Sequence, residues 1–269
     1  MKLKSLIIGT AAALSVASMA IADRGSDGHV NIIYWQAPSI LNPYLSGGTK
    51  DVESSSMIIE PLARYNQDGE LTAWLATEIP TVSNGGVSAD LMSITWNITP
   101  GIKWSDGSAF TAHDVVFTGN YCMNPDGGCA QSNKLADVAN IEALDDLTVK
   151  VTFSVAKPFP YGPFVGAEQP IIQKAQFADC MGAKAPECTE QNFGPIGTGP
   201  FRVTEFKAND VISMEANPMY RDPAKPSFAT VTFKGGGDAA AAARTVDGLR
   251  RRCTPRNDGV GSCLFFKFT

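Results

Sequence analysis

Hydrophobic and polar residues alternate along several stretches of the chain. Residues 94–98 and 148–155 place an apolar residue at every second position, which is typical of a strand with one buried face. Residues 201–206 and 211–216 are bounded by Gly, Pro and Asn and are further predicted strands. Residues 30–35 form a continuous apolar run, which favours a short strand covered on both faces.

Two stretches have helical features instead. Residues 49–60 place apolar side chains on one side of a helix that Pro61 would stop. Thr111 is a helix-capping residue, and Asp114, three positions later, can reach back to the cap. Residues 115–117 then give this second helix its buried side. Strands interspersed with helices predict a mixed α/β fold.

The N-terminus has the pattern of a secretory signal peptide. Two lysines precede an apolar stretch from Leu6 to about Ala20, and small residues follow up to Ala22. The stretch is shorter than the roughly 20 apolar residues of a membrane-spanning helix. We expect cleavage after Ala22 and export to a periplasm, with residues 1–22 removed.

The composition and charge narrow the range of possible functions. The 269 residues include 44% hydrophobic residues and carry a net charge of -5, which is enough apolar material for one or two domains. Nothing in this charge points to nucleic acid. Five of the 22 basic residues but only two of the 27 acidic ones lie in residues 247–269, so the last segment differs in character from the rest.

The cysteines fit an exported protein. Cys122 and Cys129 lie seven residues apart, and Cys180 and Cys188 lie eight apart. Each pair encloses a short loop with Gly or Pro, so we predict two disulfides. Two histidines and no paired C-x-x-C motifs speak against a metal site.

Catalytic motifs are missing from the sequence. It contains neither His-Glu-x-x-His nor Gly-x-Ser-x-Gly, and Gly197-Thr198-Gly199 does not continue into a phosphate-binding pattern. Asp145 and Asp146 are expected in a solvated turn, and His113 in the first turn of a helix. We therefore expect no catalytic residues, no cofactor and no enzyme activity.

Aromatic residues around the first predicted strand suggest binding. Tyr34, Trp35 and Tyr44 flank the strand and the turn after it, where rings could line a ligand cleft. Burial in the core is an equally good interpretation for Trp35, which ends the apolar run.

The loop after that turn is the candidate ligand-binding segment. Its glycines would let the main chain of a ligand approach the protein backbone, and free N–H and C=O groups there could bind a peptide as an added strand. A flexible turn would explain the same glycines. The predicted ligand-binding residues are Ser46, Gly47, Gly48 and Thr49.

Several motifs in this order resemble the bacterial extracellular solute-binding proteins of family 5, the receptors of oligopeptide and dipeptide ABC importers. The motifs are Leu41-Asn42-Pro43, Ile58-Ile59-Glu60-Pro61-Leu62, Trp104-Ser105-Asp106-Gly107 with Thr111-Ala112-His113-Asp114-Val115, Val151-Thr152-Phe153 with Pro158, Gly197-Thr198-Gly199-Pro200-Phe201 and Asn217-Pro218-Met219-Tyr220.

The resemblance implies a periplasmic binding protein fold of the type II class, in which two lobes close on a ligand. Residues 23–62 and 165–246 correspond to the first lobe, and residues 63–164 to its extra, β-rich subdomain. The second lobe is missing. In this family the loop after Leu-Asn-Pro lines the cleft, and Gly47 replaces an acidic residue of some peptide receptors.

The function implied is capture of an oligopeptide or dipeptide by a monomeric receptor and its delivery to membrane permease subunits. Receptors of the same family for a nickel complex, an opine or an oligosaccharide are alternatives. An exported, chaperone-like binding protein is an alternative of another class.

Family members are much longer than this chain. After a helix expected over residues 238–246, they continue into the second lobe, whereas residues 247–269 are rich in Arg, Cys, Gly and Pro. We expect an out-of-frame or unstructured tail there, with no role for Cys253 and Cys263, and a truncated chain with impaired binding.

Overall fold

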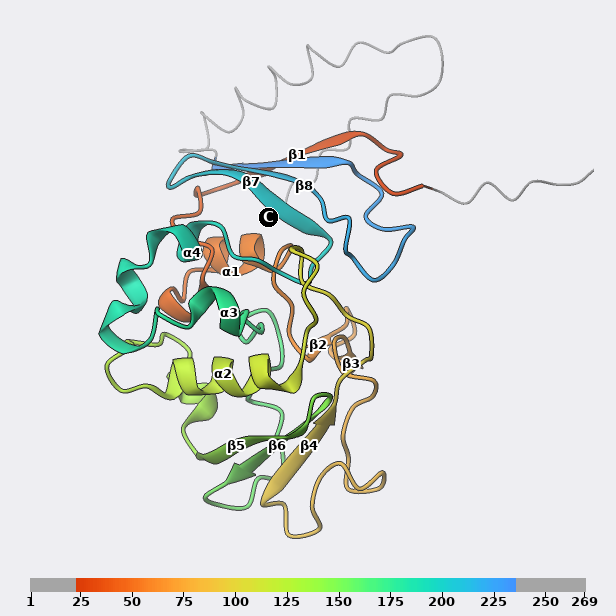
Figure 1. Cartoon of the computed structure of the whole chain (residues 1–269), viewed down its shortest axis with the longest axis vertical. Coiled ribbons are helices and arrows are strands. Elements are labelled where there is room, and N and C mark those ends of the chain that lie inside the picture. Colours follow the sequence, from red (N-terminus) through yellow and green to blue (C-terminus); the bar gives the residue numbers. More distant parts are fainter. Residues whose placement is uncertain (1–22, 236–269) are drawn as a thin grey trace, which may run out of the picture.

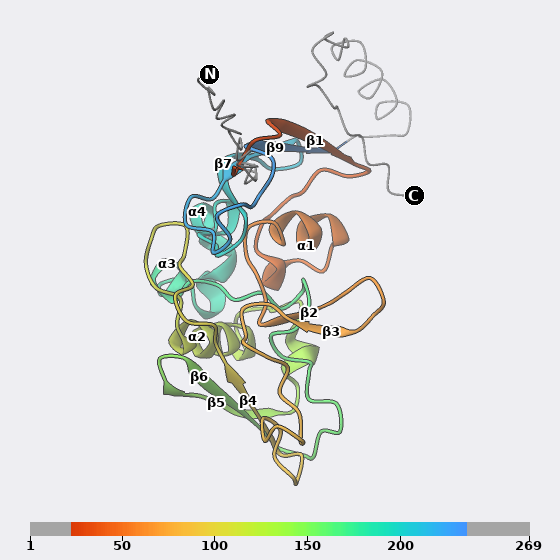
Figure 2. The same cartoon turned by 90° about the vertical axis from the view of Figure 1, so that its right-hand side faces the viewer.

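Two β-sheets lie at opposite ends of the molecule, and helices fill the space between them (Figures 1 and 2). The computed structural model describes residues 23–235. The predicted signal peptide, the helix expected over 238–246 and the predicted tail lie outside the described residues. The strands are β1 (His29–Tyr34), β2 (Ala63–Tyr65), β3 (Leu71–Ala73), β4 (Ser93–Asn97), β5 (Val138–Asp145), β6 (Thr148–Phe153), β7 (Phe201–Lys207), β8 (Val211–Ala216) and β9 (Thr230–Gly235); the α-helices are α1 (Thr49–Ser55), α2 (Ala112–Met123), α3 (Lys174–Phe177) and α4 (Thr189–Phe193).

A mixed four-stranded sheet joins the beginning and the end of the described chain. Its order is β1-β9-β8-β7. The β1–β9 pair is parallel, with Val30 opposite Val231, and the other two pairs are antiparallel. The strands predicted over 201–206 and 211–216 are present as β7 and β8.

Within the described residues, the two sides of strand β1 are not equally buried, whereas the prediction was a strand covered on both faces. Val30 and Tyr34 are buried, whereas Asn31 and Ile33, which point to the opposite side, are partly exposed. Because successive side chains of a strand point to opposite sides, the side that carries Val30 and Tyr34 packs on the core, and the other side is less buried within residues 23–235.

A second, antiparallel sheet of order β4-β6-β5 forms the other end of the molecule. The turn at Asp145 and Asp146 joins β5 to β6, and both residues are exposed as predicted. Helix α2 packs closely on this sheet: a Cβ added to Gly119 would lie 2.2 Å from the Ile141 side chain. The predicted capping contact at the start of α2 is present, because the Thr111 N–H donates to Asp114 Oδ2 at 3.0 Å.

Helix α1 is shorter than predicted and ends at Ser55 rather than near Glu60. The Ser54, Ser55 and Ser56 hydroxyls donate to the main-chain carbonyls three residues earlier, at 3.2, 2.9 and 2.7 Å. Serine hydroxyls compete with the main chain for these carbonyls, so the serine run ends the helix before Pro61 is reached.

The structure contains both disulfides that the spacing predicts. Cys122–Cys129 closes the loop at the end of α2, and Cys180–Cys188 closes the segment between α3 and α4. Within residues 23–235, no helix is both long and apolar enough to cross a membrane.

Candidate functional site

The predicted loop lies between a short 3-10 turn, Pro43–Leu45, and helix α1. The turn is firmly anchored: Tyr44 is fully buried, its hydroxyl donates to the Pro170 carbonyl at 2.6 Å, and its N–H donates to Asn42 Oδ1 at 3.1 Å. Tyr44 is therefore a core residue and does not line a cleft.

Gly47 and Thr49 are exposed, while Ser46 and Gly48 are partly buried. A Cβ added to Gly47 would meet no atom within 4 Å, so there is open space in front of this part of the loop. Gly48 is the N-cap of α1, and its N–H donates to Ser46 Oγ at 3.1 Å. Gly47 is thus an open backbone position of the candidate loop.

A buried carboxylate holds the loop to the rest of the chain. Asp51 is 1% exposed and accepts hydrogen bonds from Ser46 Oγ at 2.7 Å, the Ser39 N–H at 2.7 Å and Lys50 Nζ at 2.8 Å. Burial alone would raise the pKa of Asp51, but these hydrogen bonds outweigh it and the net pKa is lowered. Ser46 therefore has a structural task.

The aromatic residues at the end of β1 separate into inner and outer rings. Tyr34 is 5% exposed and Trp35 is 53% exposed, which rules out core burial of Trp35. The two rings lie 3.9 Å apart between centroids. The Tyr34 hydroxyl donates to Glu53 on α1, so β1 and α1 are joined by a hydrogen bond beside the candidate loop.

The sequence reasoning assigned no role to Glu53 or Glu60. Glu60 is 0% exposed and accepts from Trp74 Nε1 at 2.6 Å, Thr198 Oγ1 at 2.9 Å and the two Arg221 Nη atoms at 2.7 and 3.2 Å. A charged residue inside the apolar motif 58–62 is the signal that could have indicated a buried partner.

Cationic and aromatic side chains lie around Glu60 and Arg221. The Arg64 guanidinium lies 3.7 Å from the centroid of the Trp74 ring, and that of Arg221 lies 4.8 Å from the centroid of Tyr220. The Arg221 guanidinium also lies 5.1 Å from the centroid of the Trp74 ring, and this contact joins the β2–β3 hairpin to the segment after β8. The cluster is a structural junction, because the Glu60 carboxylate is already occupied by donors of the chain itself.

Gly197-Thr198-Gly199 also has a structural explanation. A Cβ on Gly197 would lie 1.8 Å from the Ile58 carbonyl oxygen, and one on Gly199 would lie 2.6 Å from it. The Gly199 N–H donates to the same oxygen at 2.8 Å. The glycines allow the backbone at residues 197–199 to touch the backbone at Ile58.

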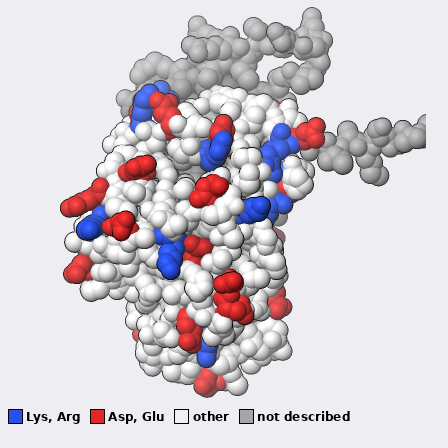
Figure 3. Space-filling view, viewed as in Figure 1, with Lys and Arg blue, Asp and Glu red and all other residues white. Residues whose placement is uncertain are grey.

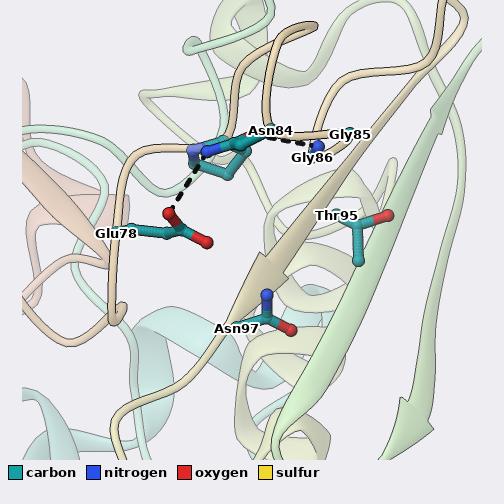
Figure 4. Close-up of a pocket in the computed structure, with 7 residues that line it drawn as sticks. Glu78, Asn84, Gly85, Gly86, Thr95 and Asn97 are labelled. Carbon is teal, nitrogen blue, oxygen red and sulfur yellow. Dashed lines mark hydrogen bonds between the residues drawn. The ribbon is translucent and has the colours of Figure 1, made fainter.

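Within residues 23–235, the surface hollows include two between residues 78 and 138. One, of about 160 Å³, is lined by Glu78, Asn84, Thr95 and Asn97 among others (Figure 4). The Asn84 amide is committed to the protein, because it donates to Glu78 at 3.3 Å and accepts from the Gly86 N–H at 3.0 Å.

The other hollow, of about 480 Å³, lies beside the Cys122–Cys129 disulfide. Neither hollow includes a residue of the candidate loop. Among residues 23–235, no group of three or more His, Cys, Asp or Glu side chains is placed to hold a metal ion.

The arrangement of surface charges agrees with the net charge of the sequence, which does not point to nucleic acid binding. On the face in Figure 3, basic side chains lie among acidic ones and do not gather into one basic patch. This face has none of the continuous positive surface that a nucleic acid backbone requires.

The fold is shared with substrate-binding proteins. It matches the oligopeptide-binding protein AppA of Bacillus subtilis, solved in complex with a nonapeptide, at a TM-score of 0.75 and 23% identity. The match covers 85% of this chain and 44% of AppA. The profile of the bacterial extracellular solute-binding proteins, family 5 Middle, matches residues 70–248. The chain therefore belongs to this family, as its motifs indicated.

Curated relatives agree with this membership. The chain is 27% identical over 194 residues to the glutathione-binding protein GsiB of Pectobacterium atrosepticum, covering 72% of this chain and 35% of GsiB. It is 27% identical over 208 residues to the oligopeptide-binding protein OppA of Bacillus subtilis, covering 70% of this chain and 34% of OppA.

The chain thus spans about a third of the length of these relatives. The family is defined by solute binding and not by catalysis, which confirms the expectation of a protein that is not an enzyme.

Proposed function

We propose that this chain is part of a periplasmic receptor that captures oligopeptides or dipeptides and delivers them to a membrane ABC permease. Family membership carries the proposal. The relatives named for glutathione and oligopeptide binding, and the fold match to AppA with its nonapeptide, support peptides as the solute class.

We further propose that residues 23–62 and 165–246 belong to the first lobe and residues 63–164 to its subdomain. The four-stranded sheet, which joins β1 to β7, β8 and β9, supports this division. The loop of Ser46, Gly47, Gly48 and Thr49 would then face the solute, with Gly47 offering the open backbone position.

A receptor of this kind binds tightly by enclosing its ligand between lobes. The chain covers 44% of AppA, so we propose that on its own it binds peptides weakly, with a dissociation constant well above micromolar.

Isothermal titration calorimetry of the full chain with a mixture of di- to pentapeptides tests this proposal. Weak, saturable heat at millimolar peptide is expected. No heat at any concentration would contradict solute capture by this lobe, and micromolar affinity would contradict the need for a second lobe. The variant Gly47→Val should abolish the weak heat, because its side chain occupies the open space. Thr72→Val, at an exposed position of strand β3 where the extended backbone accepts valine, is the control.

A further inference from the structure

Three aromatic rings form a row of contacts from the core beside the four-stranded sheet to the surface. Phe233 on β9 is 3% exposed, and its ring lies 5.1 Å from that of Tyr34, which is 5% exposed. The Tyr34 ring lies 3.9 Å from that of Trp35, at an interplanar angle of 31°. The two inner rings are buried. The Trp35 indole, at 53% exposure, therefore packs against the Tyr34 ring and is open to solvent elsewhere.

A carboxylate is fixed beside these rings. The Tyr34 hydroxyl donates to Glu53, an exposed residue of α1. Burial and this contact raise the pKa of the Tyr34 hydroxyl, which therefore stays protonated and acts as the donor. Glu53 is thus placed by a neutral partner, which supplies no counter-charge.

The Glu53 carboxylate has no counter-ion in the part of the chain that the structure describes. The nearest basic residue in sequence, Lys50, is paired with Asp51 at 2.8 Å, and this pair is largely buried, at 15% and 1% exposure. None of the ion pairs formed within residues 23–235 includes Glu53.

Glu53 also lies on the correct side of α1 for a solute at the candidate loop. Thr49 and Glu53 are four residues apart, so they occupy the same face of the helix, and both are exposed. Figures 1 and 2 place α1 in the layer next to the four-stranded sheet that contains β1. A solute that touches Gly47 and Thr49 can extend along α1 towards Glu53.

We propose that Trp35 and Glu53 form a cation subsite that takes an ammonium or guanidinium group of the bound solute. This inference rests on the proposed function and narrows it to positively charged peptides. The face of an indole attracts organic cations, and a carboxylate forms charge-assisted hydrogen bonds with N–H donors. An acidic group in the same position would be repelled by Glu53. Both contacts are solvent-exposed, so together they give a preference of about tenfold for a cationic over a neutral solute.

The test uses the full chain and four tripeptides. Three are N-acetylated and C-amidated: Ala-Lys-Ala, Ala-Ala-Ala and Ala-Glu-Ala. The fourth, Ala-Ala-Ala with a free N-terminus, distinguishes a terminal ammonium from a lysine side chain as the source of the cation. Binding is followed by NMR of the tryptophan indole N–H signals. Trp96 and Trp104 are 0% and 1% exposed and serve as internal references.

The blocked lysine peptide is expected to shift the Trp35 signal and to bind about tenfold more tightly than its neutral counterpart. Glu53→Gln keeps an acceptor for the Tyr34 hydroxyl but should reduce this preference about threefold, and Trp35→Ala about fivefold. Glu142→Gln on β5 and Phe159→Ala, at 60% exposure, remove a similar charge and ring elsewhere and should leave the preference unchanged.

Equal binding of the three blocked peptides would overturn the cation subsite and leave the proposed function standing. Lysine amide, which lacks a peptide chain, separates the two in the other direction. If lysine amide shifts Trp35 as strongly as the blocked lysine peptide does, the subsite stands and peptide capture fails. A Trp35 signal that no cationic probe moves contradicts the subsite.

Discussion

Glu53 and Glu60 lie seven residues apart, yet the structure uses their carboxylates in opposite ways. Glu60 is fully buried and is bonded by Trp74, Thr198 and Arg221, so its charge is balanced by the protein. Glu53 is exposed and holds the Tyr34 hydroxyl as its hydrogen-bond partner within the described residues. A carboxylate whose positions are filled by the chain supports the fold, whereas one that keeps its charge available can recognise a solute.

Asp51 lies two residues before Glu53 in sequence and resembles Glu60 in environment. It is buried and bonded by Lys50, Ser46 and Ser39. Of the acidic residues in segment 51–60, Asp51 and Glu60 thus stabilise the fold, and Glu53 is available to a solute. Changing each in turn tests this division.

The largest effect is expected at the Glu60 cluster. Arg221→Met leaves a buried carboxylate without its charged partner, which lowers the free energy of unfolding by about 3–5 kcal/mol. Urea denaturation measures this loss. The control is Arg202→Met, which breaks the exposed Arg202–Glu215 pair and should cost less than about 1 kcal/mol. Equal losses would show that Glu60 is not held as a structural charge.

A smaller effect is expected at Asp51. Asp51→Asn removes the charge that Lys50 and the two serines stabilise, and we expect a loss of about 1.5–3 kcal/mol, in the range of hydrogen bonds to a charged group. Chemical denaturation at neutral pH measures it. An unchanged midpoint would place Asp51 in the same class as Glu53.

The pH dependence of stability gives the sign of the Asp51 contribution. Its pKa in the folded state is below the ordinary value of 3.8, so the unfolded chain binds the proton more readily. The stability from Asp51 is fully present above that value and is lost as the pH falls through the folded pKa. Denaturation from pH 7 to pH 2.5 should show the wild type and Asp51→Asn converging at the acid end. A constant gap would refute the shift.

The smallest effect on stability is expected for Glu53→Gln. The residue is exposed and its hydroxyl partner keeps an acceptor, so the free energy of unfolding should change by less than about 0.5 kcal/mol. A thermal melt beside the Arg221→Met variant makes the comparison. A loss as large as that of Arg221→Met would mean that Glu53 supports the fold and is not available for a solute.

Local patterns in the sequence predicted much of the fold. The period of two over residues 94–98 and 148–155 predicted β4 and β6, and the Thr111–Asp114 spacing predicted the start of α2. These signals depend on neighbours within a few residues. The end of α1 was missed because it depends on three serine hydroxyls, which the apolar pattern does not register.

The sites depend on contacts that the sequence alone does not pair. Glu60 and Arg221 are 161 residues apart, and Tyr34 and Glu53 are 19 apart. The aromatic pair at residues 34 and 35 was recognised, but which ring is buried depends on which side of β1 packs on the core, and Tyr34 shares that side with Val30. Whether Ser46, Gly47, Gly48 and Thr49 bind a solute stays a prediction.

Carboxyl NMR on the full chain, with its glutamates labelled at the side-chain carbonyl carbon, tests the central comparison most directly. On addition of blocked Ala-Lys-Ala, the Glu53 signal, assigned with Glu53→Gln, should shift with peptide concentration. The Glu60 signal should stay in place. A Glu53 signal that does not respond, or a Glu60 signal that moves with it, would contradict the division between an available and a structural carboxylate.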